Sequence, residues 1–278
     1  MRIALGLEYD GSAFCGWQTQ PSACGVQDHL QSALARFADS PIEVTAAGRT
    51  DTGVHATAQV VHFDTDAVRE PISWVRGPNA CLGPELRVIW SREVPAEFHA
   101  RYSALSRTYR YLLLNEPVAP AILRDRVGWF HVPLDVERMG EACAAVVGEH
   151  DFSAFRDSQC QSRSPIRTIF EARVARHENL VAFTFRANAF LHHMIRNLVG
   201  SLVYVGAGRQ EPGWITDLMA SRDRRLAAPT FAASGLYLAG VEYDPAFDLP
   251  AFRPQPLLTS HPRLRQDHSR AGCVGDPI

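Results

Sequence analysis

The spacing of apolar side chains divides the first hundred residues into strands and helices. Ile3, Leu5 and Leu7 alternate with polar or small residues, which is typical of a strand, whereas Leu30 and Leu34 recur at helical spacing. The predicted elements are, in chain order, a strand at 2–9, a helix at 26–38, strands at 42–46 and 59–63, a helix at 71–82 and a strand at 86–94. Strand, helix, strand, strand, helix, strand is the order of a ferredoxin-like domain.

A similar order follows a polar, basic connection at 95–106. The elements predicted there are a strand at 108–114, a helix at 133–147, strands at 166–176 and 180–186, a long helix at 190–206 and a strand at 236–243. We therefore expect an α+β protein with two ferredoxin-like halves, residues 1–104 and 105–247, whose sheets meet at a central cleft. Residues 248–278 become rich in proline and lack periodicity, which predicts a disordered tail.

An unusually polar connection, residues 47–56, lies between the two short strands of the first half. It contains two glycines, which allow a close backbone approach, together with Arg49, Asp51 and His55. Catalytic groups often sit on such loops, so we take Asp51 as the candidate reacting group. The alternative is a polar turn in which Asp51 bonds its own backbone. His55 likewise either touches a ligand of the loop or makes a structural hydrogen bond.

The long helix predicted at 190–206 has one apolar face. Arg196 falls opposite that face, where it points into a cleft or into water. His192 and His193 are adjacent, so on a helix their side chains would diverge by about 100°. We therefore expect the two histidines to cap or pack the helix rather than to share a metal ion.

Two tyrosines and an arginine alternate on the strand predicted at 108–114. Period two places Tyr109 and Tyr111 on one face and Arg110 on the other. The tyrosines are either half-buried aromatics of the sheet or a platform on which a base stacks. We expect the structural interpretation to hold for one of them.

Composition narrows the class of protein. Of the 278 residues, 46% are hydrophobic and 21% are charged, as in ordinary globular proteins. No apolar run approaches the roughly 20 residues that span a bilayer, and Glu8 comes too early for the apolar region of a signal peptide. We therefore expect a cytoplasmic protein with no membrane partner.

Cysteine and arginine usage adds two expectations. The six cysteines form no CxxC pair, which predicts reduced thiols, no disulfide and no metal site. A formal net charge of −2 argues against a nucleic-acid partner, but the chain has no lysine and its arginines cluster. The clusters are Arg101, Arg107 and Arg110; Arg124 and Arg126; Arg163 and Arg167; and Arg222, Arg224 and Arg225. Such local basic stripes can bind RNA phosphates.

Several of these segments together resemble the bacterial tRNA pseudouridine synthase A family. Residues 47–56 match the family signature AGRTDxGVHA, and the likeness extends over about residues 1–245. The other matching segments are 7–11, 16–18, 98–104, 109–111, 160–163, 187–190, 192–194, 196–197 and 235–237. The resemblance implies an enzyme that isomerises uridine to pseudouridine in the anticodon stem-loop, at positions 38–40 of tRNA. It also implies a homodimer that needs no cofactor and no metal.

The resemblance also assigns roles to single residues. The family's aspartate at the position of Asp51 is essential, and its arginine at Arg196 pairs with that carboxylate, which favours the ionised form. The tyrosine at Tyr109 packs against the target uracil and is a candidate for removing the C5 proton. Arg49 would help to expose the target nucleotide. The further residues expected to contact RNA are Arg101, Arg110 and His55.

The implied reaction fits these residues. The N1–C1′ bond breaks, the uracil turns, and C5 bonds to C1′ without any redox change. A carboxylate can begin by attacking C1′, by attacking C6 or by removing the C2′ proton, and the sequence does not choose, although the family's favoured route is the last. The chain departs from the family at Thr52, Ala56 and Thr19. Thr52 removes no reacting group, so we expect activity to survive. Many family members have an arginine at the position of Thr19, and the RNA contact of that arginine is not carried over to this chain.

Two other functions share part of the pattern. Asp51-Thr52-Gly53 is the core tripeptide of aspartic proteases, but their paired aspartates share a proton, and this chain has one such tripeptide with charged neighbours. A non-catalytic RNA-binding module is the stronger alternative, because ferredoxin-like domains often bind RNA on a sheet. Such a module would not need an aspartate that faces an arginine across a cleft.

Overall fold

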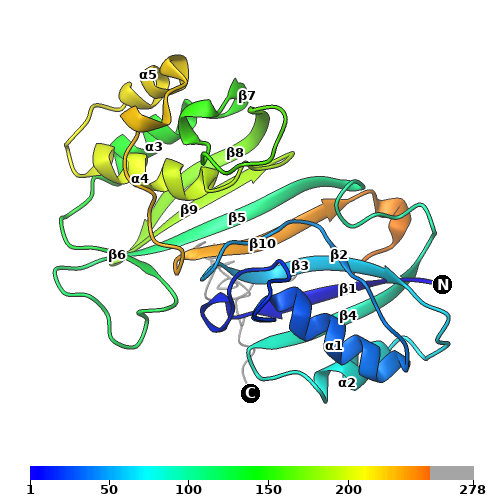
Figure 1. Cartoon of the computed structure of the whole chain (residues 1–278). Helices are drawn as coiled ribbons and strands as arrows, with labels where there is room; N and C mark the ends of the chain where they lie inside the picture. The colour runs from blue at the N-terminus through cyan, green and yellow to red at the C-terminus, as the bar shows by residue number, and fades with distance from the viewer. Residues whose placement is uncertain (251–278) are drawn as a thin grey trace, which may run out of the picture.

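A computed structural model describes residues 1–250 of the chain (Figure 1). The elements of the first half are β1 (Arg2–Tyr9), α1 (Val26–Ala38), β2 (Thr45–Ala46), β3 (His55–Asp64), α2 (Ser73–Asn79) and β4 (Leu86–Val94). Those of the second half are β5 (Ala104–Asn115), β6 (Gly128–Phe130), α3 (Val136–Ala144), β7 (Gly148–Asp151), β8 (Ile166–His177), β9 (Leu180–Ala187), α4 (Met194–Gly206), α5 (Trp214–Ser221) and β10 (Leu236–Tyr243). The α+β class expected from the sequence is confirmed.

The strands of both halves join in one continuous sheet. Its order is β4-β1-β3-β10-β5-β9-β8-β7, with β2 added beside β3 and β6 beside β5. The last strand, β10, closes the junction because it pairs with β3 in parallel and with β5 in antiparallel register. Tyr237 of β10 lies opposite His55, the first residue of β3. The polar loop that precedes β3 therefore sits where the two halves meet.

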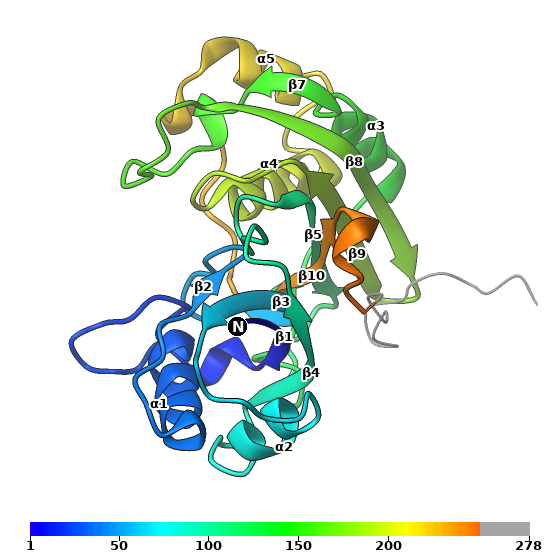
Figure 2. The ribbon, with the colours of Figure 1, turned by 90° about the vertical axis from the view of Figure 1, so that its right-hand side faces the viewer.

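Helices cover the sheet separately in each half (Figure 2). The helices α1 and α2 lie against the strands of the first half, and Leu30 and Leu34 of α1 are fully buried there. The helices α3, α4 and α5 lie against the second half, where Leu198 and Leu202 of α4 are fully buried. The apolar stripes of α1 and α4 are thus buried in their own halves, as the helical spacing indicated.

Several boundaries differ from the sequence prediction. The helix α4 begins at Met194, not at residue 190, because His193 has a left-handed backbone with φ of 59° that a helix does not admit. The strand expected at 42–46 reduces to β2 with two residues. The short elements β6, β7 and α5 carried no clear period and were not predicted. The tail expected beyond residue 247 lies mostly outside the described residues.

The expectation of reduced cysteines is wrong at one pair. Cys15 and Cys24 form a disulfide with a Cα–Cα distance of 5.4 Å. The connection from β1 to α1 folds back on itself, and the backbone N–H of Cys15 donates to the carbonyl of Cys24 at 2.9 Å. The two cysteines are nine residues apart and form no CxxC motif, so the sequence did not indicate that they lie close together. Among the other described cysteines, Cys81 is an exposed thiol, Cys143 a buried one and Cys160 a half-buried one.

Candidate active site

The loop that carries Asp51 is held from several directions before any ligand binds. The carbonyl of Gly48 accepts a hydrogen bond from Gln59 Nε2 at 2.7 Å, and that of Thr50 accepts one from the backbone N–H of Trp17 at 2.9 Å. The Thr50 hydroxyl also pairs with the Tyr9 hydroxyl at 2.8 Å. Bonds from three separate segments hold the residues that directly precede Asp51, so its carboxylate has a defined direction.

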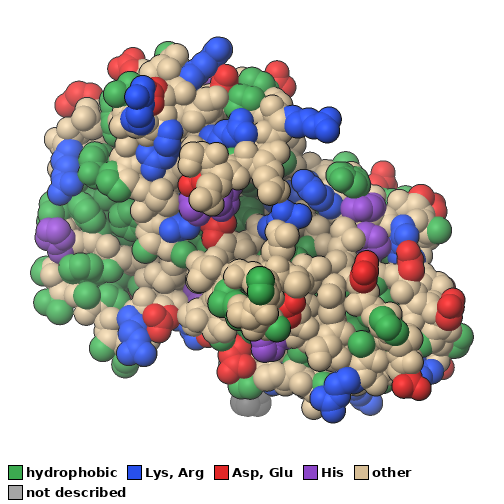
Figure 3. All heavy atoms as spheres, in the orientation of Figure 1, with side chains coloured by type: hydrophobic (Ala, Val, Ile, Leu, Met, Phe, Trp, Pro, Cys, Tyr) green, Lys and Arg blue, Asp and Glu red, His purple; other side chains and the backbone are tan. Residues whose placement is uncertain are grey.

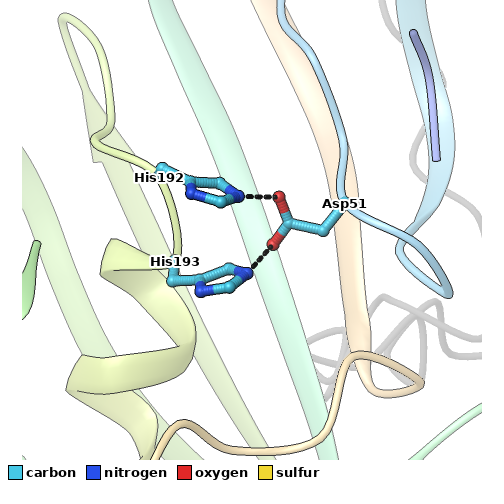
Figure 4. A group of neighbouring side chains, drawn as sticks. All are labelled: Asp51, His192 and His193. Carbon is cyan, nitrogen blue, oxygen red and sulfur yellow. Dashed lines mark ion pairs between the residues drawn. The ribbon is translucent and has the colours of Figure 1, made fainter. Parts of the chain in front are cut away.

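The Asp51 carboxylate faces three nitrogen atoms that come from the start of α4. Arg196 Nη1 lies 3.2 Å from Asp51 Oδ2, His192 Nε2 lies 3.2 Å from Oδ1, and His193 Nε2 lies 3.3 Å from Oδ2. Figure 4 shows both histidines and Asp51 approaching each other from opposite sides of the gap. The Asp51 side chain is 22% exposed, so a ligand can still reach it. The predicted pairing of Arg196 with Asp51 is therefore present in the structure.

Arg196 is itself anchored at a second point. Its Nε donates to the carbonyl of Phe231 at 2.8 Å, while its own carbonyl accepts from the Phe231 backbone N–H at 3.2 Å. The guanidinium thus turns one edge toward Asp51 and another toward the segment that leads into β10. This two-point attachment uses the planar fork that distinguishes arginine from lysine.

A second carboxylate, Asp157, stands behind the two histidines. His193 Nδ1 lies 2.8 Å from Asp157 Oδ2, and His192 Nδ1 lies 3.5 Å from Asp157 Oδ1. Burial by itself would raise the pKa of Asp157, but hydrogen bonds from the Gln159 backbone and from His193 outweigh it and leave the pKa below its ordinary value. Asp157 is therefore ionised at neutral pH.

Tyr109 lies beside the same cleft, whereas Tyr111 belongs to the core. The Tyr109 ring packs edge-on against Phe190, with 5.2 Å between centroids. Its hydroxyl lies close to Gly48 of the Asp51 loop, since a Cβ added to Gly48 would stand 3.8 Å from that oxygen. Burial raises the pKa of Tyr109, and the charges of Tyr9 and Asp51 act in the same direction, so its phenol stays protonated. Tyr111 is fully buried and donates to the Ala232 carbonyl at 2.9 Å. The structural interpretation thus holds for Tyr111, while a stacking role for Tyr109 stays a prediction.

His55 has the structural role, not a place beside Asp51. It is buried; its Nδ1 accepts from the Gly11 backbone N–H at 3.0 Å, and its Nε2 pairs with the Ser234 carbonyl at 3.1 Å. Its ring also stacks on Tyr237 at 4.7 Å. Because these contacts occupy both ring nitrogens, the interpretation of His55 as an RNA contact finds no support in the geometry.

The predicted arginines occupy different environments. Arg49 is exposed on the Asp51 loop, and Arg101 is exposed beside Tyr102, with its guanidinium carbon 5.5 Å from the ring centroid. Arg110 is half-buried on the opposite face of the sheet from Tyr109, and burial and the charge of Arg173 lower its pKa. It is therefore not brought to Asp51. Figure 3 shows arginine, histidine and carboxylate side chains around the indentation between the two halves.

The histidine pair also has the composition of a metal site. Within the described residues, ligand atoms of Asp51, His192 and His193 lie within 4.8 Å of one another. The two histidine side chains do not diverge by about 100° as expected, because both residues precede α4. Their rings stack instead, with 4.0 Å between centroids. Arg196 nevertheless places a permanent positive charge 3.2 Å from the same carboxylate. Like charges repel, so this arrangement suits hydrogen bonding better than a cation.

Sequence reasoning missed the cooperation of His192, His193 and Asp157. Helical periodicity assigned the histidines to diverging directions, and no periodic pattern includes Asp157, which sits in a turn where its carboxylate accepts from the Gln159 backbone. The only available signal was local: two histidines and an arginine within five residues.

A sheet shared by two α/β halves, with an aspartate facing an arginine where they meet, is the arrangement that the family resemblance implies. The family model for tRNA pseudouridine synthase matches residues 7–103 and 142–244. The tRNA pseudouridine synthase A of Burkholderia cenocepacia is 56% identical over 90% of this chain and 93% of its own length. Those of Methylobacillus flagellatus and Thiobacillus denitrificans are each 54% identical over 90% of this chain and 96% of their own.

The chain belongs to the tRNA pseudouridine synthase family. It is an isomerase that acts on RNA and forms pseudouridine in tRNA. A solved structure entitled "Crystal Structure of a Cbf5-Nop10-Gar1 Complex" aligns with 72% of this chain and 45% of that chain at 14% identity, with a TM-score of 0.31. Within residues 1–250, no helix is long and apolar enough to cross a bilayer.

Proposed function

We propose that the chain isomerises uridines on the 3′ side of the anticodon stem-loop, at positions 38–40 of tRNA, and that Asp51 is the carboxylate that begins the reaction. The observation that carries this proposal is the contact of 3.2 Å between Asp51 and Arg196 at the junction of the two halves. The guanidinium donates to one oxygen of the carboxylate and holds it in a fixed direction. An ionised carboxylate is the form that acts as a nucleophile or a base.

The reaction needs no group beyond the chain's own side chains. Whether Asp51 meets C1′, C6 or the C2′ hydrogen first, its negative charge starts the cleavage of the N1–C1′ bond, whose electron pair leaves with the uracil. The uracil then turns and C5 bonds to C1′. The C5 proton is lost, N1 regains a proton, and Asp51 is restored. Because the atoms of the product equal those of the substrate, no energy source or redox partner is required.

Three further residues have proposed roles in holding the substrate. Tyr109 gives an apolar ring face beside the Asp51 loop, on which the freed uracil can rest while it turns. Arg49 and Arg101 are exposed and can bind phosphates of the RNA backbone. Since a uridine in a stem must leave its stack at a cost of a few kcal/mol, such contacts would offset that cost.

The family resemblance supports two more proposals about the working protein. We expect it to act as a homodimer that recognises the shape of tRNA, and to do so in the cytoplasm. Sedimentation of the purified chain with and without tRNA tests the dimer directly.

The site of modification can be tested with two tRNA transcripts that carry tritium at uridine C5. One has uridines at positions 38–40 and the other has cytidines there. Tritium release from the first transcript alone is the expected result, because C5 loses its hydrogen when it bonds to C1′. Equal release from both transcripts would place the reaction elsewhere in tRNA.

A further inference from the structure

Two rows of contacts connect Asp51 with Asp157 through the histidine pair. Figure 4 shows the part of each row that joins Asp51 to a histidine. One row runs from Asp51 Oδ1 through His192 to Asp157 Oδ1, with distances of 3.2 and 3.5 Å. The other runs from Asp51 Oδ2 through His193 to Asp157 Oδ2, with distances of 3.3 and 2.8 Å. Each carboxylate therefore faces both imidazole rings, and each ring faces both carboxylates.

The backbone is shaped to make these rows parallel. The left-handed conformation of His193 stacks its ring on that of His192, with 4.0 Å between centroids and 27° between planes. Such a conformation is uncommon for a residue other than glycine, although histidine adopts it more often than most, and it persists where the surroundings hold it. The backbone N–H of Asp157 donates to the His192 carbonyl at 3.1 Å, which ties the second carboxylate to the pair.

We infer that His192, His193 and Asp157 are positioning residues for the Asp51 carboxylate. This inference rests on the proposed function of Asp51. Two parallel N–H donors fix both oxygens of a carboxylate, so its plane cannot rotate. Asp157 holds the far nitrogens of the same rings and so fixes the direction of the donors. Arg196 adds the third contact, and the three donors together aim the carboxylate at a single point of the cleft.

Each imidazole ring has two nitrogens, and one of them faces each carboxylate, so the ring couples the direction of Asp51 to that of Asp157. The charged groups that face the pair are Asp51 from the loop before β3, Asp157 from the turn after residue 155, and Arg196 from α4. Displacing either ring therefore displaces Asp51.

Steady-state tritium release from C5-labelled tRNA tests the inference. The variants are His193→Leu, which has no donor, His193→Gln, which keeps an N–H at the position of Nε2, and Asp157→Asn. We expect kcat to fall on the order of 10²-fold for His193→Leu, since small misplacements of a reacting group have such effects. We expect a smaller fall for the other two variants and a nearly unchanged KM for all three. His177→Leu, at an exposed histidine at the end of β8, is the matched control and should leave kcat unchanged.

The split between kcat and KM and the rescue by glutamine separate positioning from a merely structural role. The single variants His192→Gln and His193→Gln each keep an N–H donor toward Asp51, so both should retain more kcat than His193→Leu. An unchanged kcat in His193→Leu, a defect confined to KM, or no recovery of kcat by His193→Gln would overturn the inference. Should His193→Leu unfold, Asp157→Asn and the glutamine variants test the same positioning role. No release by the wild type would overturn the proposed function, and this inference with it.

Discussion

Arg196 Nη1 contacts Asp51 Oδ2 at 3.2 Å although 145 positions of the chain separate the two residues. The contact joins the loop before β3 to the first turn of α4, and therefore the first half of the chain to the second. The fold brings this about by inserting β10 between β3 and β5, which places the Asp51 loop beside the start of α4. The candidate site thus depends on the junction of both halves.

Arg196→Gln should lower kcat on the order of 10²-fold, because the variant removes a fixed positive charge from the carboxylate that we propose reacts. Binding of tRNA, measured by filter retention, should change little. Arg196→Lys should recover part of the activity, since lysine keeps the charge but cannot also donate from Nε to Phe231. Full activity of Arg196→Gln would show that the Asp51 contact plays no part in the reaction.

Two variants test the ring of Tyr109 and its hydroxyl separately. Tyr109→Leu removes the stacking face, which should weaken binding of the target uridine by about 1–3 kcal/mol and raise KM. Tyr109→Phe keeps the ring, so KM should stay near the wild-type value while kcat falls if the hydroxyl handles a proton. Steady-state kinetics on the same tRNA measures both. Equal KM values for Tyr109→Leu and the wild type would exclude the stacking role.

The Asp51 loop also depends on a glycine that lies far from it in the sequence. Gly16 has φ of +91°, and an added Cβ would stand 2.9 Å from the Thr50 carbonyl. Gly16→Ala should lower the free energy of unfolding by about 1–2 kcal/mol and reduce activity through the displaced loop. Gly140→Ala is the control, because this glycine lies inside α3 with nothing within 4 Å of an added Cβ. That variant should gain about 0.5–1 kcal/mol, and urea unfolding compares the two.

His62 should make the protein less stable in mild acid. It is buried and accepts from the Ala100 backbone N–H at 3.1 Å. Burial lowers its pKa to about 4, and the charges of His99 and Arg2 add to the effect. Between an ordinary value of about 6.5 and about 4, the unfolded chain therefore binds a proton that the folded chain does not, and stability falls with falling pH by up to about 3 kcal/mol.

The variant His62→Gln isolates this contribution. Its free energy of unfolding should depend less steeply on pH over that range than the wild-type value does. His55, whose pKa is also lowered, lies apart from His62 and contributes equally to both proteins. His177→Gln, at an exposed position, should keep the wild-type slope. Identical slopes for His62→Gln and the wild type would contradict the assignment.

The sequence predicted the major helices and strands because their apolar positions follow one period over many residues. It also placed Arg196 on the polar side of its helix and Asp51 in a shaped loop. The sequence prediction failed where the backbone departs from regular helix geometry. His193 has a left-handed backbone, so the helical spacing assumed for His192 and His193 predicted the wrong directions for their side chains. The approach of Cys15 to Cys24 and the position of Asp157 depend on turns, for which the chain has no periodic signal.

The most direct test of the role proposed for Asp51 is tritium release from C5-labelled tRNA by the wild type and by Asp51→Asn. The variant keeps the shape of the side chain but removes the negative charge on which every route to the product depends. We predict release by the wild type, none by Asp51→Asn, and equal binding of tRNA by both. Release by Asp51→Asn at the wild-type rate would remove Asp51 from the reaction and contradict its proposed role.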